Sequence, residues 1–268
     1  DAFVRVLSDE SHPPRLLTVP AAADGAILCA YPDAAPSEVL CFKNGVPTGI
    51  INSKNDFLGG NHAVMFVDTH AKAGEKISLA FECYAGHGCL GCSPFDNFGN
   101  DHPETHFERT YHGIRLMVLD TEMRDFLFDL STVLQLARLP QTNFVAMRAY
   151  ECLMNCFPHL VQDPYNCSED ELRESARAMR PLLAPALAKK PGGDRSRGFI
   201  GVVGHSHMDT AWLWPITETV RKCARTYAEA LTLMDMYPEY TFVQSSALHL
   251  DWMRRFYPTI FEGIKQRV

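Results

Sequence analysis

Three side chains that can bind a metal ion stand after an apolar run, Phe199–Val203, that predicts a strand buried on both faces. They are His205, His207 and Asp209, at every second position of the sequence. In extended backbone this spacing points all three side chains to the same side. Two imidazoles and a carboxylate at the carboxyl end of a buried strand predict half of a divalent-metal site, with zinc as the first candidate.

Two large aromatic residues, Trp212 and Trp214, follow this triplet. An indole ring offers a flat apolar surface to the C–H face of a sugar, whose hydroxyls seek polar partners. Pro215 then fixes the backbone for the start of a helix. The pattern therefore predicts a metal site that contacts a carbohydrate.

The run from His205 to Pro215, His-Ser-His-Met-Asp-Thr-Ala-Trp-Leu-Trp-Pro, resembles the opening signature of glycoside hydrolase family 38, the retaining α-mannosidases. Upstream, Gly59-Gly-Asn-His62 and Glu82-Cys-Tyr-Ala-Gly-His87 resemble the N-terminal sandwich domain of the cytosolic-type branch of that family. The resemblance covers nearly the whole chain and is densest from Gly201 onward. After the signature it continues through residues 218–222, 224–226, 237–238 and 241–246, and through matches between 252 and 265.

The resemblance implies a role for each matching residue of the signature. His207 and Asp209 correspond to the first two zinc ligands of the family, with Co²⁺ as an alternative metal. Trp212 corresponds to a tryptophan that packs against the bound mannose. His205 corresponds to a histidine beside the metal, where it would orient a ligand. The nucleophilic Asp, the acid/base carboxylate and the last zinc His are expected downstream of Val268.

The activity that the resemblance implies is zinc-dependent, retaining hydrolysis of α-linked mannose from oligosaccharides, through a covalent mannosyl-aspartate. The chain alone is expected to be inactive because the nucleophile lies outside it. Asp96 precedes the zinc motif in the wrong domain and is not interpreted as the nucleophile. The carboxylates after Asp209 are interpreted as solvated and structural: Glu218, Glu229, Asp235, Glu239, Asp251 and Glu262.

Two other classes of function stay open at this point. One is a free-standing sugar-binding or subunit protein without catalysis of its own. The other is a His-x-His-x-Asp metal-dependent hydrolase, of the metallo-β-lactamase type or of the amidohydrolase type. Thr210 stands where the metallo-β-lactamase pattern has its last His, and the paired tryptophans are unexplained in an amidohydrolase.

Composition restricts the class of partner and the compartment. The net charge of −7 argues against nucleic acid and against anionic membrane surfaces. No apolar run approaches the roughly 20 residues that a membrane span requires. The nine cysteines are odd in number and irregularly spaced, which favours a reducing compartment. We expect a cytoplasmic protein, with a lysosomal or vacuolar one as the alternative.

The expected partners are mannose-containing oligosaccharide, the rest of its own catalytic domain and, as an open option, a second copy of the chain.

The pattern of apolar residues divides the chain into four segments. Residues 1–119 predict an antiparallel β-sandwich domain, with a hairpin turn at Asn44-Gly45. Residues 120–190 predict a helical connecting region, in which Ser168 to Glu171 form a capping box and Pro181 and Pro185 break or kink the last helix. Residues 191–198 predict a linker. Residues 199–268 predict the opening β-α-β of a parallel α/β catalytic domain, incomplete in this chain.

Overall fold

The computed structural model describes residues 3–6, 16–34, 38–52, 65–84, 111–140, 142–163, 165–188, 201–212 and 214–268. The chain forms two compact units, Asp1–Val118 with Val202–Val268, and Leu119–Gly201. The resemblance at residues 59–62, Asp96 and the linker at 191–198 lie outside the described residues. The same holds for His87, Cys89 and Cys92, a group interpreted from the sequence as a loop with free thiols.

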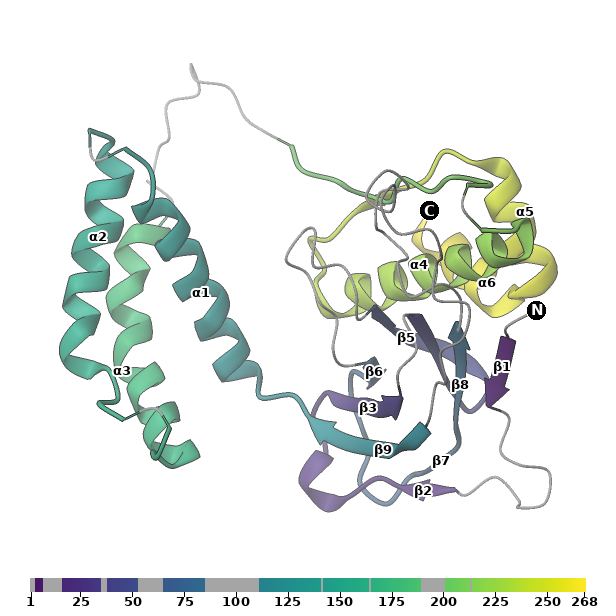
Figure 1. Cartoon of the computed structure of the whole chain (residues 1–268), viewed down its shortest axis with the longest axis horizontal. Coiled ribbons are helices and arrows are strands. Elements are labelled where there is room, and N and C mark those ends of the chain that lie inside the picture. Colours follow the sequence, from purple (N-terminus) through teal and green to yellow (C-terminus); the bar gives the residue numbers. More distant parts are fainter. Residues whose placement is uncertain are drawn as a thin grey trace, which may run out of the picture. The chain divides into compact units, whose positions relative to one another are not determined.

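The first unit contains antiparallel sheets (Figure 1). One sheet has the strand order β1 (Phe3–Val6), β8 (Leu79–Tyr84), β4 (Glu38–Lys43), β5 (Val46–Asn52). A second has the order β6 (Met65–Asp68), β3 (Leu28–Ala34), β9 (Tyr111–Val118), and β2 (Leu17–Thr18) pairs with β7 (Lys76–Ile77). A short 3₁₀ helix, η1 (Ala21–Ala23), follows β2. Antiparallel pairing throughout this region is as the sequence predicts.

Strand β4 separates two hydrophobic clusters because its side chains alternate between the faces of the sheet. Val39 and Cys41 join a buried core with side chains of the second sheet, among them Leu28 and Met65. Leu40, on the opposite face of β4, packs into a cluster with helix residues from the C-terminal part of the chain. The hairpin turn at Asn44-Gly45 is confirmed, since both residues have positive φ, 52° and 81°.

The C-terminal part of the first unit contains β10 (Gly204–His205), α4 (Ile216–Met236) and β11 (Phe242–Val243), followed by α5 (Ala247–Phe256) and α6 (Pro258–Arg267). Strands β10 and β11 pair in parallel across α4, which confirms the predicted β-α-β order. Helix α4 packs against β4 and β5 on one side and against α5 and α6 on the other. The predicted segments 1–119 and 199–268 therefore lie in one compact unit, Asp1–Val118 with Val202–Val268.

The predicted buried strand before the metal motif is wrong in its described part. Residues 201–203 have no strand structure, and Val202 is 88% exposed. Strand β10 begins only at Gly204, where the chain first pairs with β11. A Cβ on Gly204 would lie 2.9 Å from the carbonyl oxygen of Thr241 and 2.7 Å from the hydroxyl of Tyr240. A glycine is thus needed for the two strands to approach this closely.

The second unit is a group of three helices, α1 (Thr121–Ala137), α2 (Phe144–Cys156) and α3 (Glu169–Leu187), with the 3₁₀ helix η3 (Phe157–His159) after α2. The predicted capping box is confirmed, because the Ser168 hydroxyl accepts from the Glu171 backbone and the Glu171 carboxylate accepts from the Ser168 backbone. Helix α3 continues through Pro181 and Pro185, so of the predicted break or kink the break does not occur. Its buried residues Met179 and Leu183 keep it packed against α1 and α2 across these prolines.

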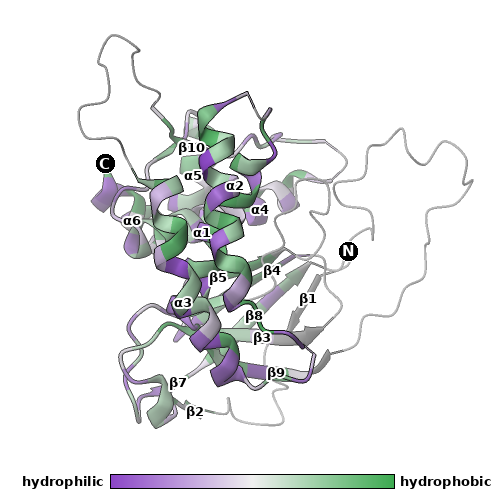
Figure 2. Cartoon of the chain, turned by 90° about the vertical axis from the view of Figure 1, so that its left-hand side faces the viewer, coloured by the Kyte–Doolittle hydropathy of each residue, from purple (hydrophilic) through white to green (hydrophobic). Residues whose placement is uncertain are grey.

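The buried face of α2 differs from the prediction. Met147, Tyr150 and Met154 recur at helical spacing in the sequence, which predicts a core-packing face, but these side chains are exposed. The residues that α2 buries are Ala146, Ala149, Cys152 and Cys156, one position earlier on the helix. Hydrophobic and hydrophilic residues alternate along the ribbons of α1 and α2 (Figure 2). Small side chains in the core let the three helices approach one another closely. A pattern of apolar residues does not take side-chain size into account, so it does not predict this choice of face.

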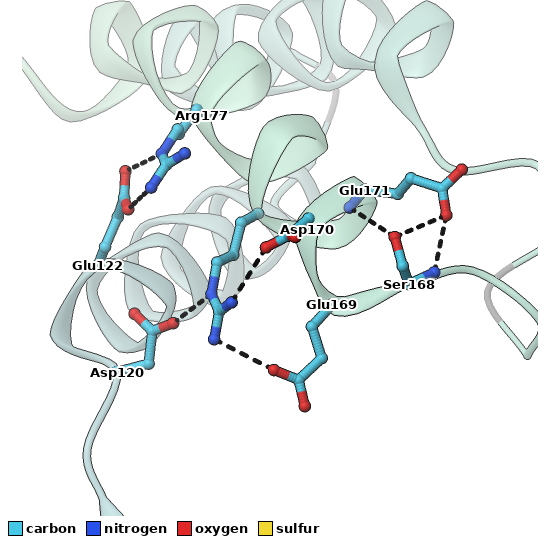
Figure 3. Close-up of polar contacts among 8 residues, drawn as sticks. Asp120, Glu122, Ser168, Glu169, Asp170, Glu171 and Arg177 are labelled. Carbon is cyan, nitrogen blue, oxygen red and sulfur yellow. Dashed lines mark hydrogen bonds and ion pairs between the residues drawn. The ribbon is translucent and has the colours of Figure 1, made fainter. Parts of the chain in front are cut away.

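Three arginines of α3 reach across to acidic residues of α1 and its N-cap. Figure 3 shows one of these contacts, between Arg177 and Glu122. Arg173 Nε lies 2.9 Å from Asp120 Oδ2, and Arg177 makes two hydrogen bonds of 2.8 Å with the Glu122 carboxylate. Arg180 Nε lies 2.8 Å from Asp129 Oδ2. These ion pairs fix the register of α1 against α3.

Candidate metal and sugar site

The metal-binding motif lies at the carboxyl end of β10. His205 is the last residue of that strand, and residues 206–209 continue without regular structure. His207 Nε2 lies 3.3 Å from Asp209 Oδ1. The His207 side chain is 83% exposed and that of Asp209 is 43% exposed, so both ligand atoms are accessible to an ion from solvent.

His205 does not complete a three-ligand group with these two residues. Among the described residues, no group of three or more His, Cys, Asp or Glu side chains could hold a metal ion. The prediction that all three side chains converge requires extended backbone through Asp209, whereas β10 ends at His205. The structure therefore places two of the three predicted residues together.

The tryptophans form an aromatic pair beside this motif. The rings of Trp212 and Trp214 lie 5.5 Å apart in an edge-to-face arrangement. Trp212 is 50% exposed, while Trp214 is partly buried, with the Lys222 ammonium 4.7 Å above its ring. The half-exposed ring of Trp212 can stack on the C–H face of a ligand.

Two buried residues hold the loop that carries Asp209 and Trp212. The Thr219 hydroxyl donates to the Thr210 carbonyl over 2.6 Å and accepts from the Trp214 indole nitrogen over 3.0 Å. The Thr210 hydroxyl lies 3.2 Å from His249 Nε2. Burial lowers the pKa of His249, which favours the neutral ring. Sequence reasoning missed both residues, because neither Thr219 nor His249 belongs to the motif itself.

The interpretation of Glu218 and Glu229 as solvated carboxylates is wrong. Both are buried, on the same stripe of α4 as Lys222 and Arg225. The positions 218, 222, 225 and 229 have the helical spacing i, i+4, i+7 and i+11, which was the signal available in the sequence. Because α4 is covered by strands on one side and by helices on the other, a polar stripe of this helix becomes buried as well.

This stripe is neutralised by ion pairs with the sheet. Arg225 Nη2 pairs with Glu218 Oε1 and lies 2.6 Å from Glu38 Oε2, and Lys222 Nζ lies 2.5 Å from Glu38 Oε1. Burial acts to raise the pKa of Glu38, but Arg225 and Lys222 outweigh it and the pKa is lowered. Burial raises the pKa of Glu218, against the opposing effect of Arg225. Burial also raises the pKa of Glu229 to about 7, although a hydrogen bond with the Ile50 backbone acts in the opposite direction.

Comparison with known proteins supports the resemblance that the sequence indicates. The model of the glycosyl hydrolases family 38 N-terminal domain matches residues 198–268, which include the whole metal-binding motif. The chain is 32% identical over 202 residues to alpha-mannosidase 2C1 of Homo sapiens and 31% identical over 234 residues to alpha-mannosidase 2C1 of Mus musculus. It is also 41% identical over 86 residues to alpha-mannosidase G of Dictyostelium discoideum.

These matches cover much of this chain and little of the relatives. The human alignment takes in 73% of this chain and 18% of the relative, and the mouse alignment 85% and 21%. The chain therefore spans about a fifth of the length of these two relatives. The Dictyostelium alignment takes in 31% of this chain and 8% of the relative.

Proposed function

We propose that the chain supplies the first half of the zinc site of a retaining α-mannosidase, because residues 198–268 match the glycosyl hydrolases family 38 N-terminal domain. The observation that supports this most directly is the approach of His207 Nε2 to within 3.3 Å of Asp209 Oδ1, inside the matching segment. An imidazole nitrogen and a carboxylate oxygen are both ordinary zinc ligands. His207 and Asp209 would hold Zn²⁺, with Co²⁺ as the alternative, and the remaining ligands come from the rest of the catalytic domain.

The chain's own residues bind and orient the sugar in this proposal. When bound, the metal acts as a template that ligates sugar hydroxyls and fixes the orientation of the ring. Trp212 forms an apolar wall against mannose, and its half-exposed ring leaves that face accessible. His205 would orient a ligand rather than bind the metal. The substrate class is mannose-containing oligosaccharide.

The bond-breaking carboxylates are not those of α4. A retaining glycosidase needs two carboxyl groups about 5–5.5 Å apart on either side of the glycosidic bond. Glu218 and Glu229 are buried and cannot reach a sugar, while Asp251 is engaged by Arg254 and Arg255 of its own helix. We therefore propose that the chain alone binds metal without hydrolysing mannosides, and that the nucleophile belongs to the remainder of the catalytic domain.

A cytoplasmic location fits the described part of the chain. Its cysteines include the buried free thiols Cys29, Cys41, Cys152, Cys156 and Cys223. Free thiols in such number are typical of a reducing compartment. In the described helices, no stretch is long and apolar enough to cross a membrane. Fractionation of cells that express the protein tests this location, and recovery with lysosomal or vacuolar markers would contradict it.

Metal titration of the 268-residue chain tests the site. Zn²⁺ binding measured by calorimetry should be lost in Asp209→Ala and in His207→Ala. The matched control is Asp251→Ala, which removes an aspartate from α5 in the same unit and should leave zinc binding unchanged. Zinc binding that persists in both variants would contradict the assignment of His207 and Asp209 as zinc ligands.

A second experiment tests whether the catalytic carboxylates belong to a longer polypeptide than this chain. An antibody raised against residues 1–268 should detect an endogenous protein much larger than 30.1 kDa. That larger protein should release mannose from an α-mannoside, and the 268-residue chain should not. A band at 30.1 kDa, or hydrolysis by the chain alone, would overturn this part of the proposal and favour the sugar-binding or subunit function.

A further inference from the structure

The loop that carries Asp209 and Trp212 is exposed, yet one buried hydroxyl of α4 contacts it at two points. Thr219 has no exposed surface and sits one turn inside α4. Its hydroxyl has one proton and two lone pairs. The proton goes to the carbonyl oxygen of Thr210, 2.6 Å away, and one lone pair accepts the indole N–H of Trp214, 3.0 Å away.

The two partners of this hydroxyl stand next to the two residues that the proposed site needs. Thr210 directly follows Asp209, so the bond to its carbonyl restrains the backbone of the metal ligand. Trp214 supports Trp212 through the edge-to-face contact at 5.5 Å. Restraint of both groups by one hydroxyl keeps the ligand and the sugar-facing ring at a fixed separation.

Further contacts hold Thr210 and Trp214, the two residues that Thr219 contacts. The Thr210 hydroxyl meets the buried ring of His249, which stacks on Trp252 at 5.5 Å. Lys222, one turn after Thr219 on α4, covers the ring of Trp214 at 4.7 Å. Thr210 and Trp214 are thus both held, while Ala211 and Trp212 between them are exposed.

We propose that Thr219 is a positioning residue that sets Asp209 and Trp212 for joint binding of metal and sugar. This inference rests on the proposed function for its consequence, but the geometry of the anchor is independent of it. Sites hold their groups to within about 0.5 Å through the packing and hydrogen bonds of the supporting residues. Loss of such a supporting bond weakens metal affinity or activity about 10- to 100-fold.

The test compares three threonine variants of the 268-residue chain. Thr219→Val keeps the shape and removes the hydroxyl, whereas Thr219→Ser keeps the hydroxyl. Thr232→Val is the matched control, because Thr232 lies on the same helix and its hydroxyl also donates to backbone carbonyls, of Thr48 and Ala228. The first readout is the set of indole N–H resonances in ¹⁵N-labelled protein, and the second is the zinc dissociation constant.

In Thr219→Val the Trp214 indole resonance should shift, the Trp212 resonance should follow, and zinc affinity should fall about tenfold. Thr219→Ser should restore both readouts, and Thr232→Val should leave both unchanged. If Thr219→Val fails to fold, Trp214→Phe removes the indole donor and should shift the Trp212 resonance alone. Unchanged indole resonances in Thr219→Val, or equal effects of Thr232→Val, would overturn the inference. A wild-type chain that binds no zinc would instead contradict the proposed function, and the indole readout would still decide the role of Thr219.

Discussion

Glu218 and Arg225, two turns apart on α4, form an ion pair that is closed off from solvent. Glu218 is fully buried, Arg225 is nearly so, and Glu38 of β4 accepts a second bond from the same guanidinium nitrogen. This arrangement fastens the helix that follows the metal-binding loop to the outer face of a β-sheet. The loop is exposed, but its support is among the most enclosed polar structure in the described part of the chain.

Loss of Arg225 should destabilise the first unit severely. Arg225→Met leaves the buried Glu218 carboxylate without its ion-pair partner, while Glu38 keeps Lys222. Breaking a buried pair on one side costs about 3–5 kcal/mol of unfolding free energy. Urea unfolding followed by tryptophan fluorescence measures it, because all three tryptophans, Trp212, Trp214 and Trp252, lie in this unit. Arg254→Met is the control, since Arg254 pairs with Asp251 in a more exposed place and should cost under about 1 kcal/mol. Equal losses of unfolding free energy in the two variants would contradict the conclusion that the buried ion pair of Arg225 stabilises this unit.

Glu229 should make the first unit less stable as pH rises. Its pKa is raised from 4.5 to about 7, so the folded state binds a proton that the unfolded state releases. This stabilisation is complete below about pH 4.5 and is lost as pH rises through 7, by up to about 3 kcal/mol. Glu229→Gln keeps the shape without the charge and should flatten stability between pH 5 and 8. An unaltered pH dependence of urea unfolding in Glu229→Gln would refute the assignment.

A methyl group at Gly204 should disturb the start of β10. Its Cβ would meet the Thr241 carbonyl oxygen at 2.9 Å, and overpacking of this kind costs about 1–3 kcal/mol. Gly204→Ala should therefore lower the unfolding free energy and weaken zinc binding at His207. Gly201→Ala, three residues earlier, places its Cβ in open space and should be neutral in both measurements. A Gly204→Ala chain that matches Gly201→Ala would show that the strands do not need this close approach.

The second unit should lose stability in acid. Hydrogen bonds from the Met123 backbone and Arg173 lower the pKa of Asp120, and a hydrogen bond from Arg177 lowers that of Glu122. A carboxyl with a lowered pKa contributes stability above its unfolded pKa and loses it as pH falls through the folded pKa. The helical circular dichroism of this unit should therefore decline below about pH 4. Glu122→Gln should reduce that acid sensitivity, and Glu151→Gln on α2 should not; identical acid curves would contradict the role of the ion pair.

The sequence by itself determined which residues make up the candidate metal-binding loop and much of the local structure around it. His205, His207 and Asp209, with Trp212 and Trp214, could be singled out from residue types and spacing, and the family resemblance assigned the proposed roles to His207, Asp209 and Trp212. The Asn44-Gly45 turn, the caps of Ser168 and the order β10, α4, β11 are likewise local, since backbone geometry and side-chain hydrogen bonds act over a few positions.

Only the tertiary structure decided which faces are covered. Glu218 and Glu229 read as solvated on one helix, and became buried because strands cover α4 on one side and helices on the other. Val202 read as core and is exposed, because the described part of its strand pairs only from Gly204 onward. The two hydrogen bonds of the Thr219 hydroxyl form because the loop from Thr210 to Trp214 packs against the first turn of α4. Burial is a property of the assembled elements, so a periodic pattern can predict a helix without predicting what lies against each of its sides.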